Sequence, residues 1–302
     1  MSTHDYIEDE RNKNILIYIN GELTLREEAK ISVFDSGFLL GDGVWEGIRL
    51  HNGKLAFGDA HLDRLYEGAK ALDINIGMTK KEMEAAVMSA VEANSMESGV
   101  HIRLIVSRGL KRTPYQHPSA NVGGPTIVII PEYKTPNKDI LTNTLRLFTV
   151  KVRRSHPDIQ DPKLNTLSKH NCIAACIEAD KAGYDEALML DMDGNVSTCN
   201  STNFFIVRDG EVWTSTGMYC LNGITRGNII SLCRENEISV YEKDFSLSDV
   251  YSAAESFVTG TFGGVIPVSE VDGRIFGDGK RGTMTERLQK LYADLIKKEC
   301  PE

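Results

Sequence analysis

Two short glycine-containing segments have backbone N–H groups of the kind that can bind an anion. Gly223-Ile224-Thr225-Arg226 runs directly into an apolar helical pattern, so the amides of Ile224 and Thr225 project from a helix N-terminus, where free N–H groups and the helix dipole favour negative charge. Thr261 follows a strand pattern in a second glycine-rich turn and adds a hydroxyl. A capping turn without a ligand is the alternative for the first segment. Together with an arginine from a helix, the two turns predict a site for one phosphate.

A third segment, Gly37 to Gly47, is dense in glycine and contains Trp45. Glycine tolerates close approaches that a side chain would block. The segment therefore predicts a backbone held close to a ligand.

The composition describes a folded chain rather than a disordered one. The chain has 302 residues, of which 41% are hydrophobic and 25% charged, enough for one large domain or two medium ones. Thirty-four Lys and Arg against 43 Asp and Glu leave a net charge of −9, which repels nucleic acid. No apolar run approaches the roughly 20 residues that span a bilayer, and the acidic N-terminus is unlike a signal peptide. We expect a cytoplasmic protein that binds neither nucleic acid nor membrane.

The six cysteines contain no Cys-x-x-Cys pair, which is typical of a reduced compartment. Cys172 and Cys176 lie four residues apart in a predicted helix, as a metal pair could. No matching pair of Cys or His lies nearby in the sequence. We therefore expect both to be buried small hydrophobic residues, with no metal site.

The hydrophobic pattern predicts two domains joined by a linker. Residues 1–131 read as a small α+β domain, residues 132–138 as a proline-containing linker, and residues 139–302 as a larger α/β domain that contains the lysine discussed below. Apolar spacing predicts strands and helices in both. The predicted strands are 15–19, 31–34, 102–106, 126–130, 145–152, 186–190, 204–207 and 256–259, the first two forming a hairpin through Asn20-Gly21. The predicted helices are one after residue 59, one over 83–91, and 168–182, 226–236 and 283–298.

Seven motifs, in order and spacing, resemble the class IV aminotransferases, the pyridoxal-phosphate enzymes of fold type IV that include branched-chain and D-amino acid aminotransferases. The resemblance covers nearly the whole chain. Its motifs are Tyr18-Ile-Asn-Gly21, Phe34-Asp-Ser-Gly-Phe38, Gly41-Asp-Gly-Val-Trp-Glu-Gly-Ile-Arg49, His61-Leu-Asp-Arg-Leu65, Glu178-Ala-Asp-Lys-Ala-Gly-Tyr-Asp-Glu-Ala187, Asn203-Phe-Phe205 and Gly223-Ile-Thr-Arg226.

The resemblance implies a set of phosphate ligands. Arg64 corresponds to the family's phosphate-binding arginine, Ile224 and Thr225 to its backbone donors, and Thr261 to a hydroxyl contact. The alternative for Arg64 is a solvated helix arginine in a salt bridge.

The family also requires a lysine that forms a Schiff base with the cofactor, and here the sequence departs from the pattern. Counted back from Glu178 without gaps, the usual position is Asn165, thirteen residues earlier. Lys163 lies two residues before it and Lys169 four after it, and both spacings keep a side chain on the same face, of a strand or of a helix respectively. We favour Lys169, because an aromatic residue that lies against the cofactor is common at that position in relatives, whereas Lys163 aligns with a commonly basic, non-catalytic position. A solvent-facing helix lysine is the alternative for Lys169.

A second departure concerns the cofactor's pyridine nitrogen. In relatives a glutamate five residues before the asparagine of the Asn203-Phe-Phe205 motif pairs with the protonated ring. Here that position is Thr198. A hydroxyl offers one neutral hydrogen bond and does not stabilise a pyridinium as a charge does, so we expect a weaker electron sink.

Substrate recognition is expected to involve an arginine and an aromatic residue. Arg103 and Arg112 are alternatives for the substrate carboxylate, because arginine presents a planar fork to such a group. A structural anchor is the alternative for Arg103. Trp45 matches an aromatic of the family's substrate pocket, with core packing as its alternative.

The resemblance implies a pyridoxal 5'-phosphate-dependent aminotransferase that acts on an amino acid, with branched-chain substrates favoured, or an amine, together with a 2-oxo acid. Family members assemble as dimers, so we expect a homodimer. A pyridoxal-phosphate lyase similar to aminodeoxychorismate lyase, and a catalytically silent cofactor-binding protein, are the alternatives.

Overall fold

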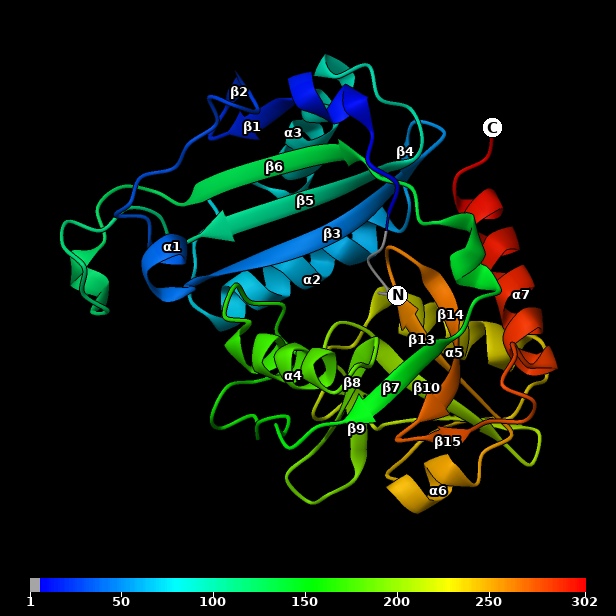
Figure 1. Cartoon of the computed structure of the whole chain (residues 1–302). Helices are drawn as coiled ribbons and strands as arrows, with labels where there is room; N and C mark the ends of the chain where they lie inside the picture. Colours follow the sequence, from blue (N-terminus) through cyan, green and yellow to red (C-terminus); the bar gives the residue numbers. More distant parts are fainter. Residues whose placement is uncertain (1–5) are drawn as a thin grey trace. The chain divides into compact units, whose positions relative to one another are not determined.

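The computed structural model describes residues 6–302, without the side chains of residues 138 and 140. The chain divides into two compact units (Figure 1). The N-terminal unit comprises Ile7–Thr135, Leu164–Lys169 and Glu299–Glu302. The C-terminal unit comprises Tyr6, Pro136–Lys163 and His170–Lys298.

The N-terminal unit is built on a six-stranded antiparallel sheet in the order β2-β1-β6-β5-β3-β4. Two helices, α2 and α3, pack on this sheet (Figure 1). The strands are β1 (Leu16–Ile19), β2 (Glu22–Leu25), β3 (Gly43–His51), β4 (Lys54–Leu55), β5 (Val100–Ser107) and β6 (Thr126–Tyr133). The helices are η1 (Glu10–Asn14), α1 (Ser36–Leu40), α2 (Gly58–Ala71), α3 (Lys80–Ala93) and η2 (Pro118–Ala120).

Strict alternation along β5 separates the two faces of this sheet. Ile102, Leu104 and Val106 are fully buried in one core with the apolar faces of α2 and α3. Because successive side chains of a strand point to opposite faces, His101 and Arg103 lie on the face away from those helices. The predicted helices and the predicted strands 102–106 and 126–130 are confirmed in this unit.

The predicted hairpin has a different second strand. Asn20 and Gly21 form the turn, with φ values of +49° and +99°, and Ile19 pairs directly with Glu22. A two-residue turn of this kind makes the residues immediately after it the partner strand. The prediction of a strand over 31–34 is therefore wrong; those residues form a turn before α1.

The C-terminal unit contains a nine-stranded mixed sheet in the order β12-β11-β10-β13-β14-β7-β8-β9, with β15 paired to β14. The strands are β7 (Leu145–Thr149), β8 (Glu186–Leu190), β9 (Val196–Cys199), β10 (Asn203–Arg208), β11 (Glu211–Thr214), β12 (Val240–Glu242), β13 (Glu255–Gly260), β14 (Gly264–Val271) and β15 (Arg274–Ile275). The helices are η3 (Lys138–Leu141), α4 (His170–Lys181), α5 (Ile224–Glu235), α6 (Leu247–Tyr251) and α7 (Thr283–Glu299).

Both faces of this sheet are covered. Phe204 and Ile206 of β10 pack in a core with α6, whereas Phe205 and Val207 pack on the opposite face with α5 and α7. Helix α4 contributes Ala175 and Ala179 to a separate cluster with Met189 of β8. Because both faces are buried, β8 and β10 are almost continuous apolar runs, and for this reason sequence patterning detected them.

Candidate active site

The segment Leu164–Lys169 is bound to the start of β3 within the N-terminal unit. Thr166 forms an antiparallel bridge with Val44, and the Leu167 amide donates to the Gly43 carbonyl at 2.9 Å. A Cβ atom at Gly43 would lie 2.7 Å from Leu167 Cδ1 and 2.5 Å from the Val106 carbonyl oxygen. The glycine-rich motif thus allows the chain itself to approach closely at this point, and β3, which sequence patterning missed, is the strand that positions Lys169.

Lys169 meets Asn165 and Trp45 at this segment. The Lys169 amine donates to the Asn165 side-chain oxygen at 3.0 Å and lies 5.4 Å from the centroid of the Trp45 indole. Asn165 is 5% exposed, and its amide nitrogen donates to the Trp45 carbonyl at 2.7 Å. The Lys169 amine therefore reaches the side chain at the position where the resembling family has its lysine.

Lys163 has a different environment, in the C-terminal unit. Its nearest charged partner is Asp161, at 3.9 Å. It lines a pocket of about 510 Å³ together with Asp191, Asp193 and Asp244.

Arg103 stacks on Trp45. Its guanidinium carbon lies 3.7 Å from the indole centroid, close enough for a cation–π interaction. Desolvation by burial lowers the pKa of Arg103, while Glu132 and Glu46 oppose that shift. Within residues 6–302 its guanidinium makes no hydrogen bond or ion pair, so its fork of N–H donors is available to an anion. Trp45 is likewise a contact residue of Arg103 and Lys169, and its indole nitrogen donates to the Thr166 carbonyl at 3.1 Å.

Arg64 belongs to a buried ion-pair cluster on the helix-covered face. The fully buried Glu46 accepts from Arg64 Nε and Nη2, each at 2.7 Å, and pairs with the buried His61 at 2.7 Å. Burial would raise the pKa of the Glu46 carboxyl, but hydrogen bonds from Arg64 and His61 outweigh it and the pKa is lowered. The salt-bridge alternative for Arg64 is therefore present, but it is 15% exposed rather than solvated, and Glu46 fixes its orientation. Sequence reasoning missed Glu46 and His61, although both lie in the quoted motifs.

Arg112 is exposed in the loop after β5. Its backbone amide donates to the Ala120 carbonyl at 2.7 Å, which closes the loop. The structure therefore does not bring Arg112 into the cluster of Lys169, Trp45 and Arg103.

The predicted helix N-terminus is confirmed in the C-terminal unit. Helix α5 begins at Ile224, after Gly223 as the N-cap residue, which has no side chain of its own to cap the helix. The Asn203 side-chain oxygen would lie 2.3 Å from a Cβ at Gly223, so only glycine fits there without a shift. Thr225 is buried, and its hydroxyl lies 3.4 Å from the hydroxyl of Tyr292. The first-turn amides of α5 are thus left for a ligand or solvent.

Three hydroxyl-bearing residues accompany this helix end in the same unit. The Thr198 hydroxyl donates to the Thr202 carbonyl at 2.8 Å, so its oxygen faces any further partner as an acceptor. Thr259, 1% exposed at the end of β13, has a hydroxyl without a hydrogen-bond partner in the part of the chain described. Thr261 follows in the turn between β13 and β14. An uncapped helix end and an orphaned buried hydroxyl fit a ligand with a phosphate group.

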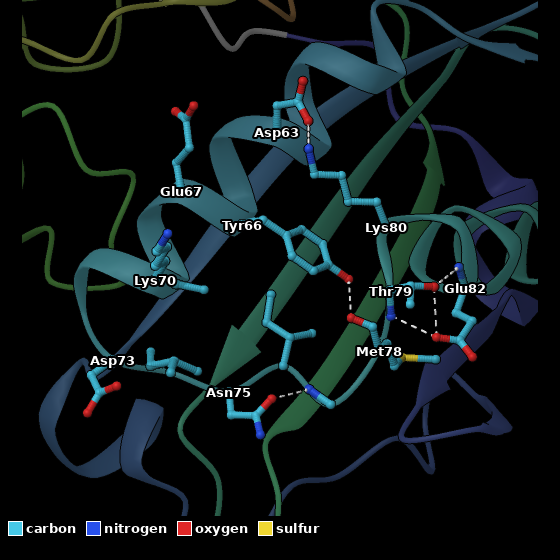
Figure 2. Close-up of a pocket in the computed structure, with 14 residues that line it drawn as sticks. Asp63, Tyr66, Glu67, Lys70, Asp73, Asn75, Met78, Thr79, Lys80 and Glu82 are labelled. Carbon is cyan, nitrogen blue, oxygen red and sulfur yellow. Dashed lines mark hydrogen bonds and ion pairs between the residues drawn. The ribbon is translucent and has the colours of Figure 1, made fainter.

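A separate surface pocket of about 630 Å³ lies at the α2–α3 connection (Figure 2). The Tyr66 hydroxyl donates to the Met78 carbonyl at 2.8 Å across it, and Asp63 and Lys80 form an ion pair at its rim. None of the residues proposed above lines this pocket. We therefore do not assign chemistry to it.

The prediction that Cys172 and Cys176 are both buried is wrong. Cys176 is exposed and Cys172 half-buried, where burial of both was expected, because the side of α4 that faces the core carries Ala175 and Ala179 instead. Cys199, Cys220, Cys233 and Cys300 are buried. Across the described residues, no group of three or more His, Cys, Asp or Glu could hold a metal ion. Among the helices in the same range, none has the length and apolarity needed to cross a bilayer.

Comparison with known proteins gives a consistent result. The family model "Amino-transferase class IV" matches residues 43–271. The Arabidopsis thaliana branched-chain-amino-acid aminotransferase-like protein 2 is 40% identical over 94% of this chain, which spans about half (51%) of that relative. The Methanocaldococcus jannaschii putative branched-chain-amino-acid aminotransferase is 38% identical over 92% of this chain and 96% of the relative.

A solved structure agrees in fold. The T.th. branched-chain amino acid aminotransferase complexed with N-(5'-phosphopyridoxyl)-L-glutamate matches with a TM-score of 0.87 and 30% identity, over 96% of each chain. The two-sheet α/β fold is thus that of pyridoxal-phosphate fold type IV, as the motifs predicted.

Proposed function

Because the chain belongs to the class IV aminotransferase family, we propose that it is a pyridoxal-phosphate-dependent transaminase whose lysine is Lys169. The observation that carries the proposal is the 3.0 Å contact between the Lys169 amine and Asn165, the residue at the family's usual lysine position. Lys163, by contrast, has Asp161 as its ion-pair partner at 3.9 Å and makes no hydrogen bond to Asn165 among the described residues.

Pyridoxal 5'-phosphate, when bound, supplies an aldehyde carbon that binds amines reversibly and a ring that accepts electrons from the substrate. We assign its phosphate to the amides of Ile224 and Thr225 and to the Thr261 hydroxyl, and we retain Arg64, oriented by Glu46, as a further phosphate ligand. Thr198 faces the ring nitrogen in this proposal. As its hydroxyl proton is used by Thr202, Thr198 offers a neutral acceptor, which stabilises positive charge on the ring less than a carboxylate would.

Lys169 has two tasks in this proposal. Its amine would hold the cofactor between turnovers. When free, the same amine would act as the base that takes the proton from the substrate's α-carbon and later gives it back. The amide oxygen of Asn165 accepts from this amine at 3.0 Å, and the indole centroid of Trp45 lies 5.4 Å from it.

Arg103 is assigned to the substrate carboxylate. Its guanidinium stacks on Trp45, is partly desolvated and has no hydrogen-bond acceptor among the described residues. A substrate carboxylate would supply that acceptor. Among amino donors we favour branched-chain amino acids, since the relatives named above are named for them.

We also propose a homodimer. Val33, Phe34 and Phe38 around α1, and Leu110 and Tyr115 in the loop after β5, are large apolar side chains between 41% and 67% exposed. The Lys111 amide donates to the Phe34 carbonyl, so the two segments are neighbours. A second copy of the chain would remove this surface from water.

The deciding experiment uses the purified chain loaded with pyridoxal 5'-phosphate. Borohydride reduction followed by peptide mass mapping should place the pyridoxyl label on Lys169, and a branched-chain amino acid with 2-oxoglutarate should yield glutamate. A label on Lys163 would show that Lys163, and not Lys169, is the lysine that binds the cofactor. Bound cofactor without any labelled lysine would favour the silent binding protein, and a 2-oxo acid product without amino transfer would favour the lyase.

A further inference from the structure

We propose that Asn165 is the positioning residue of the Lys169 amine, a role that rests on the proposed function of Lys169. Asn165 uses both ends of its side chain: the oxygen accepts from Lys169 at 3.0 Å, and the nitrogen donates to the Trp45 carbonyl at 2.7 Å. The residue is 5% exposed.

The acceptor that Asn165 offers is fixed relative to β3. Its backbone carbonyl accepts from the Trp45 amide at 3.0 Å, so the same strand residue binds both the main chain and the side chain of Asn165. With its nitrogen committed to Trp45, the amide is oriented so that its oxygen faces Lys169. A lysine side chain has four rotatable carbon–carbon bonds, and a fixed acceptor confines its amine to one place.

The chemical type of the acceptor is also significant. An amide oxygen accepts a hydrogen bond from an ammonium and from a neutral amine, whereas a carboxylate at the same distance selectively stabilises the ammonium. Asn165 therefore holds the amine in place and still lets it lose the proton that a nucleophile and base must lose.

Two substitutions separate these effects. Asn165→Ala removes the acceptor, and we expect kcat to fall by roughly 10- to 100-fold, with slower borohydride trapping on Lys169, because small displacements of a reacting group have effects of this size. Asn165→Asp keeps an acceptor but adds a charge. We expect the pH at which trapping on Lys169 is half-maximal to rise by about 1 unit or more.

Asn94→Ala is the matched control. Asn94 also binds backbone with both ends of its side chain, at Leu16 in the same unit, and no contact joins it to Lys169 in the described structure. Thermal unfolding of the cofactor-free variants measures the purely structural cost of each change. A structural role alone would lower stability in Asn94→Ala and Asn165→Ala alike, and would leave the pH profile of trapping unchanged.

The two proposals fail in different ways. If the unmodified chain is labelled on Lys169 but Asn165→Ala and Asn165→Asp trap at the same rate and with the same pH profile, the positioning role is wrong and the assignment of Lys169 stands. If the unmodified chain is not labelled on Lys169, both are wrong. A slower Asn165→Ala together with an upward pH shift in Asn165→Asp supports the positioning role.

Discussion

The guanidinium of Arg103 lies 3.7 Å from the centroid of the Trp45 indole, on the sheet face opposite the helices. Register explains the contact: Arg103 of β5 pairs with Gly47 of β3, and Trp45 is two residues away on the same face. Gly47 has no side chain to separate the two, so the arginine lies over the ring. The stack holds a charged group in place without neutralising it.

We therefore expect Arg103→Gln to raise KM for an amino acid substrate by roughly 10- to 100-fold with a smaller change in kcat, since a hydrogen bond to a charged group contributes about 1.5–3 kcal/mol. Arg103→Lys should give an intermediate KM, because it keeps the charge and loses the planar fork. Steady-state kinetics on both variants and on Arg112→Gln decides between the two arginines. A raised KM in Arg112→Gln alone would assign the carboxylate to the exposed loop.

Glu46 makes the stability of the chain depend on pH. Its folded-state pKa lies below the ordinary glutamate value of 4.5, so its stabilising contribution is fully present above that value and is lost as pH falls towards the lowered folded-state pKa. Glu46→Gln should lower the free energy of unfolding at pH 7 by about 3 kcal/mol, because the largely buried Arg64 loses its counter-charge.

Urea unfolding at pH 7, 5 and 4 measures this difference. We expect the gap between the unmodified chain and Glu46→Gln to narrow as pH falls, whereas Glu92→Gln, at an exposed position on α3, should unfold like the unmodified chain at every pH. A gap that stays constant across this range would contradict the assignment of the ionised carboxylate.

Gly43 tests whether the glycine-rich motif serves the approach of residues 164–169. Gly43→Ala places a Cβ 2.5 Å from the Val106 carbonyl oxygen and 2.7 Å from Leu167, and such overpacking costs about 1–3 kcal/mol. We expect that loss in denaturant unfolding, together with weaker labelling of Lys169. Gly227→Ala is the control: it lies in α5 with open space around it in the described structure, and alanine there should be neutral or stabilising by up to about 1 kcal/mol. Equal losses of stability and of Lys169 labelling in the two variants would contradict a specific role for Gly43.

Sequence patterning located the elements whose signal is local. Helix α3 has apolar residues at helical spacing, and β8 is a continuous apolar run, so both were predicted. Strand β3 was not predicted because Gly43 and Gly47 interrupt its alternation of apolar and polar residues. Both glycines lie where a Cβ atom would come close to neighbouring residues. The strand expected over 31–34 failed because turn length, not β propensity, selects the hairpin partner.

In the candidate site, too, the features with a local sequence signal were predicted, and those that depend on distant contacts were not. The family motifs identified the helix start at Gly223, since the cap and the helix are contiguous in sequence. The contact of Lys169 with Asn165 depends on how residues 164–169 pair with β3, more than 100 residues earlier, and spacing alone left Lys163 and Lys169 as alternatives. Glu46 binds Arg64 across eighteen positions from a strand that had not been predicted.

The start of α5 gives the final prediction, on cofactor affinity. Gly223→Ala places a Cβ 2.3 Å from the Asn203 side-chain oxygen, and Asn203 also donates to the Leu221 carbonyl at 2.9 Å, so the change displaces the turn that presents the first amides of the helix. We expect the Kd for pyridoxal 5'-phosphate to rise about tenfold or more, because two or three charge-assisted hydrogen bonds weaken together. Equilibrium dialysis measures it, and inorganic phosphate should compete less well with the cofactor in the variant. Asn228→Ala, farther along the same helix, should bind the cofactor normally, and an equal loss of affinity there would indicate a general effect on α5 rather than loss of its N-terminal anion site.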